Sequence, residues 1–175
     1  MSYRDITHNS QIINALRELE RHGIYGKLYK VRQNYGVIMF DVVATGNYIM
    51  REMQRKYVTS NYDPVNRTIT FHIEIPEYEV KEEPKQLRDA TAKEVQERLR
   101  RKGIASYVDI PDDRNAFVVI DLDSVAKYIA RNVSRVMRGN INVYVYYDRE
   151  NAVVQVHTWT GGTPEEVQKL KGEAK

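Results

Sequence analysis

Two tyrosines and a lysine alternate in the stretch YGKLYKVRQNYG, which covers residues 25 to 36. In an extended strand, residues two positions apart point to the same side, so Tyr25, Lys27 and Tyr29 share one face. Tyrosine rings with this spacing can stack successive bases of a single-stranded nucleic acid. The spacing is equally typical of a strand that packs under a helix or lies at a sheet edge, because tyrosine is favoured in strands. Tyr144 and Tyr146 form a second aromatic strand with the same two interpretations.

A row of cations follows one side of the helix expected at residues 123–138. Like charges four residues apart on a helix repel by roughly a few tenths of a kcal/mol. The row therefore needs either a phosphate backbone or carboxylates from another element beside it. In the first half of the chain, the helix expected at residues 45–57 carries Arg51 and Arg55 at equivalent places. The row itself consists of Lys127, Arg131, Arg135 and Arg138.

The basic residues recur because the chain contains an internal duplication. A shift of 80 positions aligns LRELERHGI (16–24) with QERLRRKGI (96–104), and YGVIMFDV (35–42) with NAFVVIDL (115–122). After an insertion near 138–142, the same collinear series continues to the end of each copy and aligns His72 with His157. Such a series with one gap indicates repeated units. We assign a first repeat (1–75), a linker (76–89), a second repeat (90–160) and a tail (161–175).

Each repeat predicts the order helix, strand, strand, helix, strand, strand. The first helix, expected at residues 9–22, ends at Gly23, which suits a left-handed cap. In the second repeat, Thr91 and Glu94 have the spacing of a capping box, and Gly103 ends the helix. Antiparallel hairpins predominate, so we expect an α+β fold with helices packed on one face of antiparallel sheets and a pseudo-twofold relation between the repeats. The tail predicts a short helix after Pro164 and frayed ends.

Two equivalent carboxylates, Asp41 and Asp121, each end a buried apolar strand just before a helix. Such a pair could hold divalent metal ions for phosphodiester cleavage, although aspartate at this position also caps the following helix. His72 and His157 alternate with apolar residues in strands, which favours a hydrogen-bonded structural role. The chain lacks a glycine-rich phosphate loop, a nucleophilic serine elbow and a histidine pair with metal-ligand spacing. We therefore expect no cofactor, no bound metal and no catalytic residue.

The composition narrows the class of protein. The 175 residues are 42% hydrophobic and 29% charged, and they include no cysteine, which excludes disulfides, thiolate zinc sites and a cysteine nucleophile. No apolar run approaches the roughly 20 residues of a membrane span, and the polar N-terminus lacks a signal-peptide core. We expect an intracellular, cytoplasmic protein without a membrane contact. A net charge of +3 and a pI near 9.0 favour a polyanionic partner.

Three functional hypotheses follow. The first is a non-enzymatic nucleic-acid-binding protein of archaeal or viral origin, with DNA or RNA as its partner. The second is a metal-dependent nuclease centred on Asp41 and Asp121. The third is a structural or assembly protein that forms a homodimer through its tyrosine-rich strands. For the first hypothesis, the predicted binding residues are the basic helix faces and, as a secondary contact, the tyrosine strand: Arg51, Arg55, Lys127, Arg131, Arg135, Arg138, Tyr25, Lys27 and Tyr29.

Overall fold

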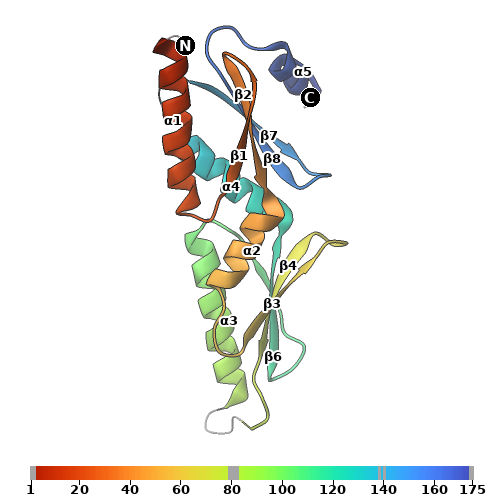
Figure 1. The fold of residues 1–175 in the computed structure, drawn as a ribbon. Helices are drawn as coiled ribbons and strands as arrows, with labels where there is room; N and C mark the ends of the chain where they lie inside the picture. Colours follow the sequence, from red (N-terminus) through yellow and green to blue (C-terminus); the bar gives the residue numbers. More distant parts are fainter. Residues whose placement is uncertain (1–2, 79–82, 138, 140, 174–175) are drawn as a thin grey trace. The chain divides into compact units, whose positions relative to one another are not determined.

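The computed structural model describes residues 3–78, 83–137, 139 and 141–173, with side chains from residue 10 onward. Within these residues it contains five helices and two four-stranded antiparallel sheets (Figure 1), which confirms the predicted α+β class. The helix-strand-strand pattern repeats along the chain. Among the described residues, no helix combines the length and apolar character needed to span a membrane.

The elements follow the order expected from the duplication. The helices are α1 (Tyr3–Glu20), α2 (Val42–Glu52), α3 (Pro84–Arg101), α4 (Leu122–Val136) and α5 (Glu165–Glu173). The strands are β1 (Gly26–Arg32), β2 (Tyr35–Asp41), β3 (Val58–Asp63), β4 (Thr68–Glu74), β5 (Tyr107–Asp109), β6 (Asn115–Asp121), β7 (Asn142–Asp148) and β8 (Val153–Trp159).

The chain divides into two compact units, and each unit takes one hairpin from each repeat. Unit 1 comprises Met1–Thr45 and Ile129–Lys175, and unit 2 comprises Gly46–Tyr128. Sheet A, in unit 1, has the strand order β1-β2-β8-β7, and sheet B, in unit 2, has the order β3-β4-β6-β5. Because β1, β2, β3 and β4 are the repeat equivalents of β5, β6, β7 and β8, the two sheets have equivalent strand orders. The repeat boundaries and the twofold relation stay predictions.

Sheet B buries one face beneath helices. Ile69, Phe71 and Ile73 alternate along β4 and are almost completely buried. Helix α3 contacts β4 and β6, and α2 lies so close to this face that a Cβ atom on Gly46 would stand 2.7 Å from Cδ1 of Ile69. The alternation of apolar residues in the sequence thus marks the face that the helices cover.

Sheet A buries Ile38 and Phe40 on one face, where Leu28 lines a small cleft together with Ile12 of α1. On the opposite face Val167, fully buried, packs against Tyr35, Val37 and Trp159. Val167 belongs to α5, so the helix predicted after Pro164 is confirmed, and it covers one end of this second face.

Local signals explain where the helices end. Gly23 and Gly103 adopt φ values of +75° and +76°, which confirms both predicted left-handed caps. Helix α3, however, begins at Pro84, a residue favoured in a first helical turn. Thr91 lies inside this helix and donates its hydroxyl to the Leu87 carbonyl at 2.8 Å. The capping-box interpretation was therefore wrong, because its spacing also fits the interior of a longer helix.

Each sheet also joins the two repeats at a helix start. The amide of Leu122, the first residue of α4, donates to the carbonyl of Arg67 at 2.9 Å, and the amide of Val42, the first residue of α2, donates to that of Ala152 at 3.0 Å. Arg67 and Ala152 are equivalent turn residues with left-handed φ values of +56° and +53°. The hairpin turn of one repeat thereby satisfies a free helix amide of the other.

Candidate nucleic-acid interface

The basic row of α4 has a carboxylate beside it. The guanidinium of Arg135 donates to Oε1 of Glu18 on α1 at 3.4 Å and to Oδ1 of Asn132 at 3.0 Å. Lys127 and Arg131 are exposed, and they fall on different sides of the division between the units. Arg138 lies outside the described residues. At Arg135, the row therefore has a carboxylate from another helix of unit 1 beside it, which is one of the two explanations for a row of like charges.

The equivalent cations of the first repeat are no longer on one helix. Because α2 ends at Glu52, Arg55 lies beyond it. Its side chain is only 16% exposed and forms an ion pair with Glu94 of α3. The hydrogen bond from Arg55 holds the pKa of the Glu94 carboxyl below its usual value. Arg51 remains on the helix, exposed, with its guanidinium carbon 6.0 Å from the centre of the Tyr48 ring.

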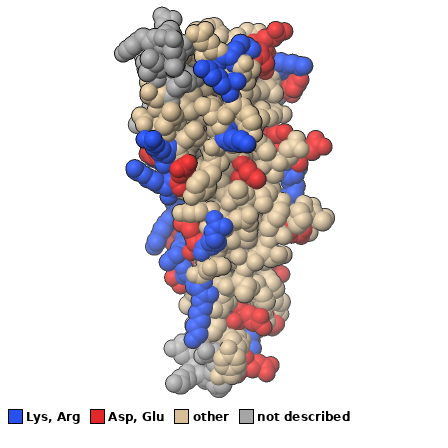
Figure 2. Space-filling view, viewed as in Figure 1, with Lys and Arg blue, Asp and Glu red and all other residues tan. Residues whose placement is uncertain are grey.

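Arg55 also lines an open cleft of about 500 Å³ in unit 2. Lys56 and Arg98 line the same cleft, so the structure brings together cations from α3 and from the segment after α2. Glu94 lines the cleft as well, and its carboxylate already neutralises the guanidinium of Arg55. Figure 2 shows the same mixing over one face of the molecule, where basic and acidic side chains lie next to one another.

The tyrosine strand, in contrast, is open. Tyr25 is 55% exposed and Tyr29 is 48% exposed, so neither is buried beneath a helix. Strand β1 lies at the edge of sheet A and pairs only with β2. The ammonium of Lys27 stands 5.6 Å from the centre of the Tyr29 ring, within the range of a cation–π contact. The exposure of both rings rules out burial under a helix, and base stacking at this edge stays a prediction.

The strand register places Lys27 and Tyr29 on the same face of sheet A as Tyr144 and Tyr146 of the second aromatic strand. Adjacent residues across sheet A form two rows, Tyr29–Val37–His157–Tyr144 and Lys27–Met39–Gln155–Tyr146. Residues in these rows share one face. On this face, Val167 of α5 packs against Val37, and Met39 and Tyr144 pack against the same cluster. The part of this face called the platform consists of Lys27, Tyr29, Met39, Tyr146 and Gln155. Its two edge strands lie roughly 14 Å apart, three strand spacings.

Sequence reasoning had identified both aromatic strands but not that they meet on one face. Met39 and Gln155, which lie between them, carried no signal of their own. Neither residue is identical in the two repeats, because Met39 aligns with Val119 and Gln155 aligns with Thr70. Only the pairing of β2 with β8 reveals the platform.

Both repeated histidines have structural partners, as predicted. The Tyr35 hydroxyl donates to Nδ1 of His157 at 2.7 Å, and Nε2 of the same ring donates to Oε1 of Gln155 at 3.1 Å. Burial lowers the pKa of His157 and raises that of Tyr35, which favours the neutral forms of both. In sheet B, His72 donates to Oδ1 of Asn115 at 2.8 Å. His157 thus also orients a platform residue, Gln155.

The paired aspartates show capping in one case. The Ala44 amide donates to Oδ1 of Asp41 at 3.2 Å, which stabilises the start of α2. Asp121 is exposed at the end of β6. Within the part of the chain that the structure describes, no group of three histidine, cysteine, aspartate or glutamate side chains could hold a metal ion.

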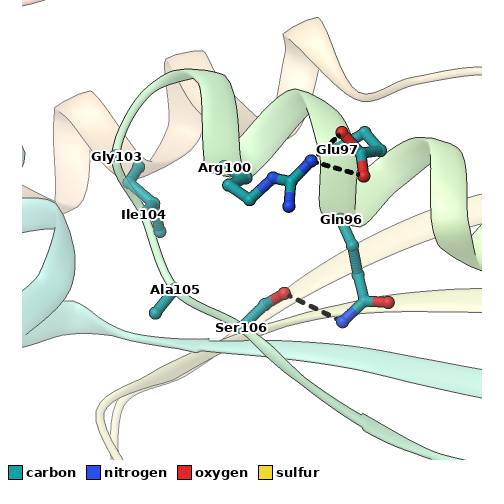
Figure 3. A pocket seen from close by; sticks show the side chains of 7 residues that line it. All are labelled: Gln96, Glu97, Arg100, Gly103, Ile104, Ala105 and Ser106. Atoms are coloured by element: carbon teal, nitrogen blue, oxygen red, sulfur yellow. Dashed lines mark hydrogen bonds and ion pairs between the residues drawn. The ribbon is translucent and has the colours of Figure 1, made fainter.

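A second open cleft, of about 480 Å³, lies where α3 ends and the chain leads into β5 (Figure 3). Its charged groups satisfy each other, since Arg100 donates to both carboxylate oxygens of Glu97 at 2.8 and 2.7 Å. Gln96 reaches across the cleft to the Ser106 hydroxyl at 3.4 Å. These contacts leave the residues that line the cleft without an unpaired charge aimed at a ligand.

No protein-family model matches this chain, and no curated protein or solved structure matches it either. The assignment of a function therefore rests on the residues and geometry of the chain itself.

Proposed function

We propose that this protein binds single-stranded nucleic acid without catalysing a reaction, and that the platform of sheet A is the contact surface. The observation that carries the proposal is the register that puts exposed Lys27 and Tyr29 on the same face as Tyr146. Some proteins bind single-stranded RNA on a four-stranded sheet, where aromatic side chains of one face stack against the bases.

The chemistry of each platform residue fits this role. The rings of Tyr29 and Tyr146 each offer a surface on which one base can stack, a contact worth about 1–3 kcal/mol per base. Lys27 lies next to Tyr29 on β1, at the other end of the row from Tyr146, and can neutralise a phosphate. Gln155 presents an amide to a base edge and is held in place by His157. The order of these groups across the sheet suits a strand that crosses it from β1 to β7.

Sheet B offers an internal comparison, because its rows are equivalent in the duplication. The rows are Thr59–His72–Phe117–Asp109 and Asn61–Thr70–Val119–Tyr107. Neither row contains a lysine or arginine, and Asp109 stands at the position of Tyr29. A polyanion would meet a carboxylate there, so we assign base stacking to sheet A and not to sheet B.

The helical cations keep a secondary place in this proposal. Arg51, Lys127 and Arg131 are exposed and stay predicted phosphate contacts. Arg55 and Arg135 are engaged with Glu94 and Glu18, so breaking these pairs for a phosphate would leave a carboxylate beside the nucleic acid.

A gel-shift series at several salt concentrations tests the proposal. Single-stranded and double-stranded probes of the same sequence, in DNA and RNA form, should show binding that weakens with salt and prefers the single strand. Probes that stay unbound at the lowest salt concentration would contradict it. A metal-dependent nuclease is not proposed, because no observation favours it; lanes with Mg²⁺ or Mn²⁺ should show uncut probe.

A further inference from the structure

We propose that copies of this chain associate head to tail, with the β1 edge of one copy docked on the β5 edge of a second copy. This association goes beyond nucleic-acid binding, and it involves the same exposed β1 strand together with the β5 edge. Both strands end their sheets, since β1 pairs only with β2 and β5 only with β6. Each therefore presents backbone groups to which another strand can add.

The first observation is the concentration of exposed apolar side chains along these two edges. Of the nine large hydrophobic side chains that are exposed in the described part of the chain, six lie on β1, on β5 or directly beside them. The edges of β3 and β7 contribute none of the nine. The six are Tyr25, Leu28, Tyr29, Val31, Tyr107 and Ile110.

The second observation is charge. Along β1, Lys27 and Lys30 are exposed, whereas Asp109 and Asp113 are exposed on β5 and the turn that follows it. Two β1 edges would bring like charges together, and so would two β5 edges, which is a common device against edge-to-edge pairing. A β1 edge against a β5 edge instead pairs opposite charges. The same charges thus disfavour β1–β1 and β5–β5 contacts and favour a β1–β5 contact.

β5 is shorter than the strand that would dock on it. The strand is only three residues long, and the segment Gly103–Ser106 before it borders the open cleft of Figure 3. The seven residues of a docked β1 would therefore extend beyond the three residues of β5. Because backbone pairing along three residues is short, the charged and apolar side chains must supply much of the affinity.

A contact between two different surfaces has a predictable consequence. Every copy carries both edges, so association does not stop at a pair unless the copies close into a ring. We therefore expect a series of species that grows with protein concentration and shrinks with salt, because salt screens the attraction between exposed opposite charges.

Charge exchange tests the pairing directly. The variant Lys27→Glu with Lys30→Glu makes β1 acidic, and the variant Asp109→Lys with Asp113→Lys makes β5 basic. Arg32 and Asp112 are left unchanged, because Arg32 binds Glu166 and Asp112 accepts the turn amides of Arg114 and Asn115. Each variant alone should lose roughly tenfold or more in self-association, since like charges now face each other.

An equimolar mixture of the two variants should associate again, because each acidic edge then finds a basic one on the other variant. Sedimentation velocity at low salt, on nuclease-treated protein free of nucleic acid, measures all these states. The control Lys85→Glu with Lys93→Glu changes two exposed lysines of α3 by the same charge and should associate like the unchanged protein.

Three results would overturn the proposal: unchanged protein that stays monomeric at its highest soluble concentration, charge variants that associate like the unchanged protein, or a mixture that stays monomeric. Failure here is separable from failure of the proposed function. The Asp109→Lys, Asp113→Lys variant leaves the platform intact, so it should bind single-stranded oligonucleotide whether or not it self-associates.

Discussion

The hydroxyl of Tyr35 donates a hydrogen bond to Nδ1 of His157 at 2.7 Å and so links β2 of the first repeat to β8 of the second. In sheet B, Asn115 and His72 form the equivalent link at 2.8 Å. Positions 35 and 115 correspond in the duplication, as do 72 and 157. Each sheet is therefore joined across the repeats by the same pair of positions, and each histidine finds its partner in the other copy.

Removing the Tyr35 hydroxyl should destabilise the protein. The change Tyr35→Phe leaves the buried Nδ1 acceptor of His157 without its donor, which costs about 1–3 kcal/mol. Urea unfolding measures the loss, and Tyr25→Phe, at a side chain that is 55% exposed, is the matched control with an expected change below roughly 0.5 kcal/mol. Equal stability of the two variants would show that the link contributes nothing.

Stability should also fall when the medium becomes mildly acidic. Burial lowers the pKa of His157 from its usual value near 6.5, so below about pH 6.5 the unfolded chain binds a proton that the native state resists. The free energy of unfolding therefore decreases as the pH falls through this window. The carboxyls of Glu166, Asp63 and Asp112, whose pKa values are lowered by hydrogen bonds, act only at more acidic pH.

The variant His157→Gln tests this origin of the pH dependence. It removes the titrating group and should flatten the loss of stability between about pH 7 and pH 5. Chemical unfolding at several pH values gives the slope of the free energy of unfolding against pH for the variant and for the unchanged protein. If the slope of the variant matches that of the unchanged protein, another group is responsible.

The glycine caps give a third prediction. Gly103 has a φ of +76°, so Gly103→Ala forces an L side chain into the left-handed region and should cost about 1–2 kcal/mol. Gly172 lies in α5, and a Cβ atom added there would have open space for 4 Å around it, so Gly172→Ala should leave thermal stability unchanged or slightly raised. Similar melting temperatures for the two variants would contradict the assigned strain.

The order of elements was predictable because periodic apolar positions and turn residues act locally. Gly23 and Gly103 marked two helix ends correctly, and the hairpins of both repeats were placed near their observed bounds. The capping-box prediction at Thr91 was wrong because the same spacing of Thr and Glu also occurs inside helices. The helix begins instead at Pro84, in a charged segment whose composition resembles that of a linker.

The site was less predictable, since it depends on contacts between distant segments. Nothing local shows that β2 pairs with β8, and this pairing alone brings Tyr29 and Tyr146 to one face. In the same way, the carboxylates beside Arg55 and Arg135 come from α3 and α1. Residue types identified the candidates, but the pairing of β2 with β8, strands from different repeats, determines which of them share a face.

The helical row and the platform can be ranked by mutation. The double change Arg131→Glu with Arg135→Glu should weaken oligonucleotide binding less than Lys27→Glu with Tyr29→Ala, because Arg135 already faces Glu18. Circular dichroism confirms that both variants are folded before binding is compared. A larger loss in the arginine variant would move the interface to α4.

Binding of a fluorescent single-stranded oligonucleotide, followed by anisotropy at several salt concentrations, tests the central claim most directly. The unchanged protein should bind with an affinity that falls linearly with salt on logarithmic axes. Lys27→Glu with Tyr29→Ala should lower the affinity by roughly tenfold or more and reduce the salt slope by about one. Tyr78→Ala, at an 81% exposed ring outside the platform, should bind normally. An unchanged protein that does not bind, or a platform variant that binds equally well, would contradict the account.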